Sequence, residues 1–423
     1  MNNKGFTLIE LLAVVILLIT ISLFVMPKIV DVIKEGDKTK ENITKNKIIE
    51  AAKEYTSNYD TNFLNDLVNV GDSKYIDKEE LINNKLLDTK DIGDIPFIKV
   101  KVILKEDNKI EYIIVDSATV SRPNYGNAVD YINNLYDIED FRKEDGLKKD
   151  NTSDANIRYE GANPNNYVKF NNELWRIIGV FDVDDGTGKV EKRMKIIRNE
   201  SIGNYSWDYT SSGSYTNEWK TAQLNTLLNS GAYYNRTTGS YYNNSTSASN
   251  VDFTSTGLTD AAKSMIGDAK WYLGGASNYT SSSNGLASHF YSYERGTAVY
   301  NSSRSTNWTG KVGLMYPSDY GYATSGGNSR NRASCMAKEL YSWDDSSYSD
   351  CKNNDWLLNT STVQWTMSPR ADNSYNVFYV NYAGFVDSCS AYYTNAGRPV
   401  VHLKSTIKVI SGSGTTSSPF ILG

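Results

Sequence analysis

The stretch Lys4-Gly5-Phe6-Thr7-Leu8-Ile9-Glu10 decides how the N-terminal part of this chain is interpreted. A short polar leader, residues 1–5, ends at Gly5. An apolar run then extends from Phe6 to Met26, and Glu10 is its only charge. About twenty apolar residues in one helix are enough to cross the hydrocarbon core of a bilayer. The pattern therefore predicts a transmembrane helix over residues 6–27.

A secretory signal peptide and a plain membrane anchor are the alternatives. A signal peptide carries several basic residues before its apolar run and a small-residue cleavage site after it. Here the leader carries only Lys4, and the run ends in Val25-Met26-Pro27-Lys28. A plain anchor leaves Glu10 unexplained, because a carboxylate in the apolar zone costs roughly 2.5–3.5 kcal/mol on insertion scales. A partner that neutralises Glu10 would remove this cost.

The order of these elements resembles the N-terminal motif of type IV pilins and pseudopilins. In that family prepilin peptidase cuts after the glycine and methylates the new N-terminal residue, which correspond here to Gly5 and Phe6. The glutamate at the fifth mature position directs filament assembly, and Glu10 stands at that position. The resemblance implies three partners: prepilin peptidase, other pilin subunits, and the cytoplasmic (inner) membrane before assembly. The location expected is a single-pass membrane protein with its C-terminal domain outside, and then a cell-surface filament.

The length, the net charge and the residue types limit the classes of function that this chain can have. The 423 residues allow two domains beyond the first helix. The net charge is −5, from 44 basic and 49 acidic residues, and no dense basic run is present, so nucleic-acid binding is not indicated. The many Tyr, Ser and Asn residues favour an extracellular surface.

The composition changes near residue 150, since every Trp, Cys and His lies after it. Before it we expect a pilin-type head over residues 28–120, with a continued helix that carries an apolar stripe from Ile29 through Ile43 and Ile48 to Tyr55. Residues 98–104 alternate at period two and return as a strand over residues 110–115, which predicts a hairpin. Polar residues 121–155 are expected to form a linker.

Residues 156–423 are predicted to form a β-rich domain. Residues 167–170 and 174–180 read as paired strands around the turn Asn171-Asn172. Two helices are expected, over Glu218–Leu228 and Thr259–Leu273, the second with Thr259 as N-cap. Long loops are expected over residues 275–334, followed by short strands to the C-terminus.

This second part resembles C-type-lectin-like domains, and more specifically their formylglycine-generating-enzyme branch. Four stretches carry the resemblance: Leu174-Trp175-Arg176-Ile177-Ile178-Gly179, Asn354-Asp355-Trp356-Leu357, Trp365-Thr366-Met367-Ser368-Pro369 and Gly397-Arg398-Pro399-Val400-Val401. The expected fold class is therefore α+β. It consists of a long N-terminal helix, first transmembrane and then amphipathic, with a small antiparallel sheet, followed by a β-rich C-type-lectin-like domain with two helices.

Cys335 and Cys351 are the best candidates for a disulfide, because an exported domain permits oxidation. Two buried free thiols are the alternative. Cys389 is the odd cysteine, either buried and inert or reactive. Formylglycine-generating enzymes use two cysteines close in sequence, and only Cys389 stands in that region here. We therefore expect no enzymatic activity.

No cofactor and no metal site are predicted. Asp182, Asp184 and Asp185 precede Gly186, but the positions of an EF-hand do not match, and a hairpin turn is the better interpretation. Calcium binding by loop carboxylates has no further support; the loop candidates are Asp344, Asp345, Asp350 and Asp372. His402 lies in an apolar strand, far in sequence from His289. Aromatic residues either pack in the core or stack on sugars; the candidates are Trp207, Trp219, Trp271, Trp308, Tyr233, Tyr234, Tyr241 and Tyr242.

These features predict a minor or tip subunit of a type IV pilus. Its large second domain would serve adhesion by contacting an unidentified extracellular glycan or protein. Two alternatives stay open: a type II secretion or competence pseudopilin whose extra domain is structural, and a membrane-tethered enzyme of the formylglycine-generating type.

Overall fold

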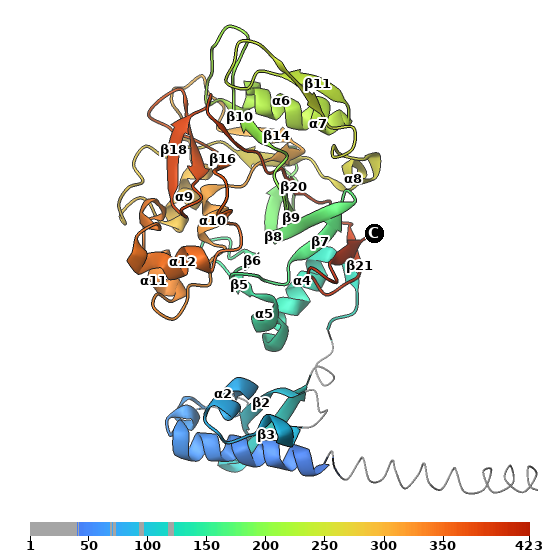
Figure 1. Cartoon of the computed structure of the whole chain (residues 1–423), viewed down its shortest axis with the longest axis vertical. Coiled ribbons are helices and arrows are strands. Elements are labelled where there is room, and N and C mark those ends of the chain that lie inside the picture. The colour runs from blue at the N-terminus through green and yellow to red at the C-terminus, as the bar shows by residue number, and fades with distance from the viewer. Residues whose placement is uncertain (1–39, 41, 68–69, 71–72, 93–96, 117–121) are drawn as a thin grey trace, which may run out of the picture. The chain divides into compact units, whose positions relative to one another are not determined.

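The chain divides into two compact units, Met1–Ser121 and Arg122–Gly423 (Figure 1). The structure, a computed structural model, describes residues 40, 42–67, 70, 73–92, 97–116 and 122–423. Gly5, Phe6 and Glu10 lie outside the described residues, as does the expected segment 6–27.

The first unit contains a helix and a three-stranded antiparallel sheet. The helix covers residues 42–54 and continues into the π-helical turn η1 (Tyr55–Tyr59). The sheet has the order β1 (Ser73–Asp77), β2 (Phe97–Leu104), β3 (Ile110–Asp116). The shorter elements are η2 (Phe63–Asp66), α2 (Lys78–Asn83), α3 (Thr89–Ile92) and η3 (Glu106–Asn108).

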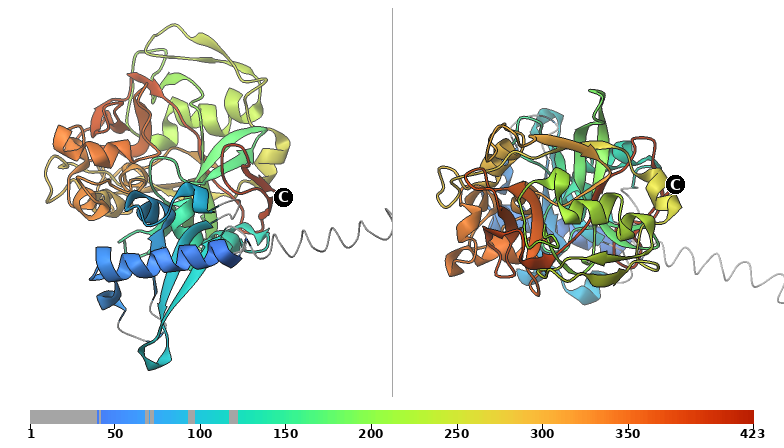
Figure 2. Two further views of the ribbon diagram at one scale, coloured as in Figure 1. Left: turned by 60° about the horizontal axis from the view of Figure 1, so that its bottom comes forward. Right: turned by 90° about the horizontal axis from the view of Figure 1, so that it is seen from above.

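The helix packs across one face of this sheet, as Figure 2 shows. Ile48 and Ala52 from the helix are fully buried in one cluster with Val100 and Val102 of β2. The period-two alternation of β2 thus places its valines on the covered face. The predicted stripe fails at Ile43, which is 55% exposed.

The larger sheet of the second unit has the order β15-β20-β9-β8-β7-β22-β21-β4, and the pair β5-β6 joins it beside β8. Its strands are β4 (Gly126–Asn127), β5 (Leu147–Lys149), β6 (Ile157–Tyr159), β7 (Tyr167–Phe170), β8 (Glu173–Asp184), β9 (Val190–Arg198), β15 (Val312–Gly313), β20 (Val400–His402), β21 (Lys408–Ser411) and β22 (Phe420–Leu422). The long hairpin of β8 and β9 lies at the centre of the unit (Figure 1).

A second sheet has the order β10 (Asn204–Ser206), β19 (Thr394–Ala396), β16 (Gln364–Pro369), β17 (Asn376–Val380), β18 (Val386–Ser390). Two small ribbons pair β11 (Thr238–Tyr241) with β12 (Ser249–Asp252) and β13 (Ala269–Tyr272) with β14 (Asn307–Gly310). The short helices are α4 (Ala128–Asp137), α5 (Glu139–Asp145), η4 (Trp219–Thr221), α6 (Gln223–Asn229), α7 (Ala232–Asn235), α8 (Asp260–Met265), α9 (Ala287–Glu294), α10 (Pro317–Gly321), α11 (Arg332–Met336), η5 (Leu340–Ser342), η6 (Ser346–Tyr348) and α12 (Ser349–Asn353).

The turns follow from local chemistry. Asn171 and Asn172 have φ values of 55° and 63°, as a two-residue type I′ hairpin requires, and they join β7 to β8. In the next hairpin the Asp184 carboxylate accepts hydrogen bonds from the amides of Gly186 and Gly188, at 2.8 and 3.0 Å. This residue thus forms the predicted turn between β8 and β9.

The predicted fold class is wrong. The structure is mostly β, with several sheets, and the described residues contain no long N-terminal helix. The second unit also carries many more helices than the two expected. The predicted helix Thr259–Leu273 ends at Met265 and is followed by strand β13. Directly after Met265 the backbone pairs with another segment: Ile266 forms an antiparallel bridge with Leu403, and the Gly267 amide donates to the carbonyl of His402 at 2.9 Å.

The expected linker over residues 121–155 also differs from the structure. From Arg122 on, these residues belong to the second unit, where β4 pairs with β21 and β5 pairs with β6. Ile132 and Leu135 of α4 are fully buried, so this segment contributes to a core.

The predicted location as a single-pass membrane protein is contradicted by the described part of the chain. Within that part, no helix combines the length and the apolar character that a membrane crossing requires.

Candidate functional site

A chain of buried charges in the second unit is the strongest candidate for a functional site. Asp319 of α10 lies between Arg158 of β6 and Lys195 of β9. Arg158 Nη1 donates to Asp319 Oδ1 at 2.9 Å, and Lys195 Nζ contacts Asp319 Oδ2. The three side chains are at most 3% exposed. Buried charges are stable only when they are paired in this way.

The network of buried ion pairs extends from Arg158 to Asp150, a residue that precedes β6 in the sequence. Arg158 Nε donates to Asp150 Oδ2 at 2.7 Å. The other carboxylate oxygen of Asp150 accepts from Thr152 Oγ1 at 2.6 Å and from the amide of Asn156 at 3.1 Å. Arg158 therefore joins two carboxylates from different parts of the fold.

The surroundings decide which of these groups are charged. Burial alone would raise the pKa of Asp319, but Lys195 and Arg158 outweigh it and bring the pKa to about 2. Burial also lowers the pKa of Lys195, while the Asp319 carboxylate opposes that change. Because Asp319 is ionised between two cations, the contact with Lys195 is an ion pair.

Glu294, the last residue of α9, lies in the same region. Its Oε1 accepts from the amide of Ser318 at 3.0 Å, and its Oε2 accepts from Ser318 Oγ at 2.6 Å. Burial raises its pKa to about 7, the neighbouring Asp319 adds to the increase, and Arg295 opposes it. Glu294 therefore titrates near neutral pH.

A small hollow of about 20 Å³, with room for about one water molecule, lies over this network. Its lining comprises Phe181, Asp182, Val183, Asp184, Lys195, Lys270, Tyr272, Arg295, Tyr316 and His402. Lys270 Nζ is 3.2 Å from Asp184 Oδ2, and the Arg295 guanidinium lies 3.4 Å from the centre of the Tyr291 ring. Burial lowers the pKa of His402 well below its usual value, so this imidazole is neutral.

The chemistry available in this hollow is limited. Its lining contains no serine, threonine or cysteine that could act as a nucleophile. Lys195, the one buried amine in the lining, is held in the ion pair with Asp319. The arrangement is therefore suited to joining β6, β9, α9 and α10, and it does not resemble a nucleophile paired with a base.

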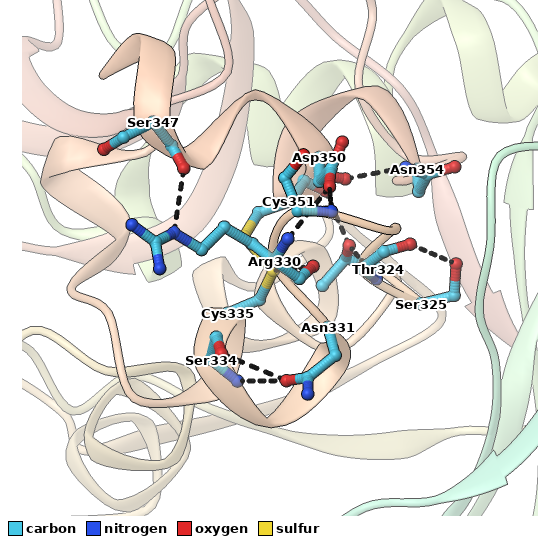
Figure 3. Close-up of a disulfide and its surroundings, with 12 residues drawn as sticks. Thr324, Ser325, Arg330, Asn331, Ser334, Cys335, Ser347, Asp350, Cys351 and Asn354 are labelled. Atoms are coloured by element: carbon cyan, nitrogen blue, oxygen red, sulfur yellow. Dashed lines mark hydrogen bonds between the residues drawn. A yellow bond between two sulfur atoms is a disulfide. The ribbon is translucent and has the colours of Figure 1, made fainter.

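The disulfide predicted from the sequence is present. Cys335 of α11 is bonded to Cys351 of α12, and both residues are fully buried (Figure 3). Asp350 Oδ2 accepts from the amides of Ser329 and Arg330 at 2.6 and 2.9 Å, which fixes the loop before α11. The contact with Arg330 is drawn in Figure 3. The bond thus joins two short helices that are also held together by carboxylate–amide contacts.

Cys389 on β18 is a free, partly buried thiol. Burial raises its pKa to about 12, and a weak contact of Asn395 Nδ2 with Sγ at 3.7 Å only partly opposes this. Because the thiolate is the reactive form of cysteine, Cys389 is poorly suited to nucleophilic or redox chemistry.

Most of the aromatic candidates for sugar stacking lie in the core. Trp207, Trp219 and Trp271 are at most 1% exposed, as are Tyr233 and Tyr241. Trp207 and Trp219 pack with ring centres 5.2 Å apart. No sequence signal separated the buried Trp207 and Tyr241 from the more exposed tyrosines nearby, because both kinds stand in Ser/Asn-rich segments.

The loop carboxylates are occupied by local contacts. Asp345 accepts from the amide of Ser347 at 2.8 Å, and Asp372 pairs with Arg370. In the parts of the chain that the structure describes, no group of three His, Cys, Asp or Glu side chains could hold a metal ion.

No family model, no curated protein and no solved structure matches this chain.

Proposed function

We propose that this chain is a minor or tip subunit of a type IV pilin-type filament, and that its second unit is a recognition domain. The observation that carries the proposal is the order of the N-terminal elements: Lys4-Gly5, then Phe6-Thr7-Leu8-Ile9-Glu10, then an uncharged run to Met26. Each element has a separate role in pilin maturation, and a plain apolar segment would need neither Gly5 nor Glu10.

The packing of the first unit supports this proposal. Its helix over residues 42–54 buries Ile48, Ala51 and Ala52 against the three-stranded sheet. At the end of the helix, Thr56 Oγ1 and the Tyr112 hydroxyl of β3 are hydrogen-bonded at 2.7 Å. A small sheet domain fixed to a helix is what a subunit needs if helices form the filament and sheets cover them.

The size of the second unit supports a minor or tip position. Arg122–Gly423 forms a compact unit of its own, much larger than the first. Subunits in the body of a filament pack closely through their helices, so a domain of this size at every position would crowd its neighbours. A subunit present once or rarely has no such restriction.

Glu10 has a defined electrostatic role in this proposal. Its carboxylate would pair with the methylated amino group of Phe6 from a neighbouring subunit, as the resemblance to pilins implies. In an apolar filament core such a pair is much stronger than in water, and leaving one partner alone is unfavourable. The pairing therefore favours the register that aligns neighbouring subunits.

The test is mass spectrometry of the N-terminal peptide of the protein in purified filaments. We expect a peptide that begins at N-methylated Phe6. An intact Met1, or a cut near Met26 with no protein in filaments, would contradict the proposal. Immunogold labelling spread evenly along the filaments would contradict the tip position alone.

Two variants separate processing from assembly. Glu10→Ala should still be cut after Gly5 but should be lost from filaments, because the assembly charge is gone. Glu54→Ala removes an exposed carboxylate from the described helix and serves as the matched control. Equal incorporation of both variants would exclude the role assigned to Glu10.

A further inference from the structure

Four tyrosines form a continuous aromatic surface on the second unit, which we call the tyrosine strip: Tyr209, Tyr215, Tyr392 and Tyr393. Successive ring centres are 6.3, 4.9 and 4.4 Å apart, and each ring is partly or largely exposed. Tyr393 is 48% exposed. Two distant chain segments thus contribute to one surface.

Partly buried hydrogen bonds hold these segments together. The Asp208 carboxylate accepts from the amides of Thr216 and Gln223 at 2.8 and 3.0 Å, which closes the loop that carries Tyr209 and Tyr215. The Asp208 amide donates to the carbonyl of Ala391 at 3.1 Å. Ser206 Oγ donates to the carbonyl of Tyr392 at 2.7 Å. The two segments that carry the rings are therefore held together before any ligand binds.

The two segments that carry the strip contain no charged side chain, and the flanking Asp208 is buried. Neither residues 209–216 nor residues 388–395 contain Asp, Glu, Lys, Arg or His. Instead, hydroxyl groups line the loop: Thr210 Oγ1 and Ser212 Oγ are 3.0 Å apart, and Ser212 Oγ and Ser214 Oγ are 3.1 Å apart. Tyr375 is 45% exposed and lies beside the turn between β18 and β19 that carries Tyr392 and Tyr393. Its carbonyl accepts from the Ala391 amide of that turn at 2.9 Å.

We propose that the tyrosine strip binds an uncharged polysaccharide. The inference rests on the proposed function, because it names the ligand class of the recognition domain. Sugar rings offer apolar C–H faces that stack on tyrosine, and their hydroxyls bond to Ser, Thr and Asn side chains. A surface without charge does not attract anionic ligands. A protein partner would favour a larger apolar centre with Trp, Met or Arg.

Rigid tyrosines lose little conformational freedom on binding, so a preformed strip reduces the entropy cost of recognition. The rings do not form one flat platform, since Tyr215 meets Tyr392 edge to face and Tyr392 stacks on Tyr393. An extended ligand can still contact rings from both segments at once. We therefore expect affinity to increase with the length of the oligosaccharide.

The test is affinity electrophoresis of the full chain in native gels that contain dextran, mannan, starch, laminarin or a soluble β-1,4-glucan. We expect retardation by at least one of them, unchanged between low and high salt. In the double variant Tyr215→Ala/Tyr392→Ala, the affinity for the polysaccharide should decrease by at least about tenfold. The double variant Tyr215→Phe/Tyr392→Phe keeps the rings and should retain most of the binding.

Tyr382→Ala is the matched control, because Tyr382 is 55% exposed and lies in the β17–β18 turn, outside the strip. The inference would be overturned by no retardation with any neutral polysaccharide, by retardation only with anionic alginate that salt abolishes, or by equal loss of binding in Tyr382→Ala. Binding through the strip to fibrinogen but to no polysaccharide would also overturn it. Cleavage before Phe6, measured in the same variants, tests the filament proposal separately.

Discussion

At the scale of single residues, Asp319 is the side chain on which the buried charges depend. It pairs with Arg158 and Lys195 at once, and all three are almost inaccessible to water. Replacing both partners of a buried pair by apolar groups can be neutral, but removing one partner leaves an uncompensated charge. Removing Asp319 should therefore reduce the free energy of unfolding by much more than an ordinary ion pair contributes to it.

Asp319→Asn should reduce the free energy of unfolding by about 3–5 kcal/mol, because two buried cations lose their shared carboxylate. Urea unfolding of the full chain, followed by tryptophan fluorescence, measures this loss. Asp182→Asn is the control, since the Asp182–Lys192 pair is about half exposed and should contribute less than about 1 kcal/mol. Similar effects of the two substitutions would contradict the role assigned to Asp319.

Glu294 should make the stability depend on pH near neutrality. Its pKa is about 7 in the folded protein and has an ordinary value of 4.5. The folded state therefore holds the proton more tightly, so the contribution of Glu294 to stability is greatest below about pH 4.5 and is lost as the pH rises through 7. The decrease due to this group should be about 3 kcal/mol. We expect Glu294→Gln to abolish this part of the pH dependence when urea midpoints at pH 5 and pH 7.5 are compared; an unchanged difference would refute the assignment.

At the scale of secondary-structure elements, the disulfide joins two helices that are too short to be stable alone. Helices α11 and α12 contain five residues each, and the bonded cysteines are 16 positions apart. Isolated helices shorter than about 12 residues are marginal in water. The covalent link and the carboxylate contacts around Asp350 therefore maintain this region together.

The double variant Cys335→Ser/Cys351→Ser should lose about 3 kcal/mol of stability, the value that the chain-entropy model gives for a loop of this length. Thermal unfolding with and without reductant measures the effect, and the reductant should lower the melting temperature of the natural chain but not that of the variant. Cys389→Ser should leave the melting temperature almost unchanged. Rapid alkylation of Cys389 at neutral pH would contradict its raised pKa.

Local sequence signals predicted strands and turns better than helices. The strand expected over residues 98–104 is β2, and the expected Asn171-Asn172 turn has the dihedral angles that its residue types favour. These features depend on neighbours in sequence. The end of α8 coincides with the bridge between Ile266 and Leu403, which is distant in sequence, so the apolar periodicity of 259–273 extended the predicted helix too far.

The buried charges of the candidate site could not be predicted either, because they too depend on contacts between residues that are distant in sequence. Nothing in the sequence around Asp319 relates it to Arg158 or Lys195, which are 161 and 124 positions away. The cysteine pair could be predicted, because cysteines are rare and few pairings exist. Charged residues are common, and only the three-dimensional fold selects the ones that are buried together.

At the scale of the whole molecule, the two units have separate hydrophobic cores, and this organisation should be visible in unfolding. Leu81 is fully buried in the core of the first unit, with Ile48 and Val100. Leu224 of α6 is equally buried in the second unit. The same Leu→Ala substitution at the two positions therefore compares the units directly.

We expect two transitions in differential scanning calorimetry of the full chain. Leu81→Ala and Leu224→Ala should each remove about 2–5 kcal/mol from their own unit and leave the other transition in place. The melting temperature of the first unit should decrease more, because the same loss of free energy shifts a small domain further than a large one. A single transition lowered by both substitutions would show that the chain unfolds as one cooperative body. The recognition domain could then not remain folded independently of the helix-bearing unit, as a display domain on a filament must.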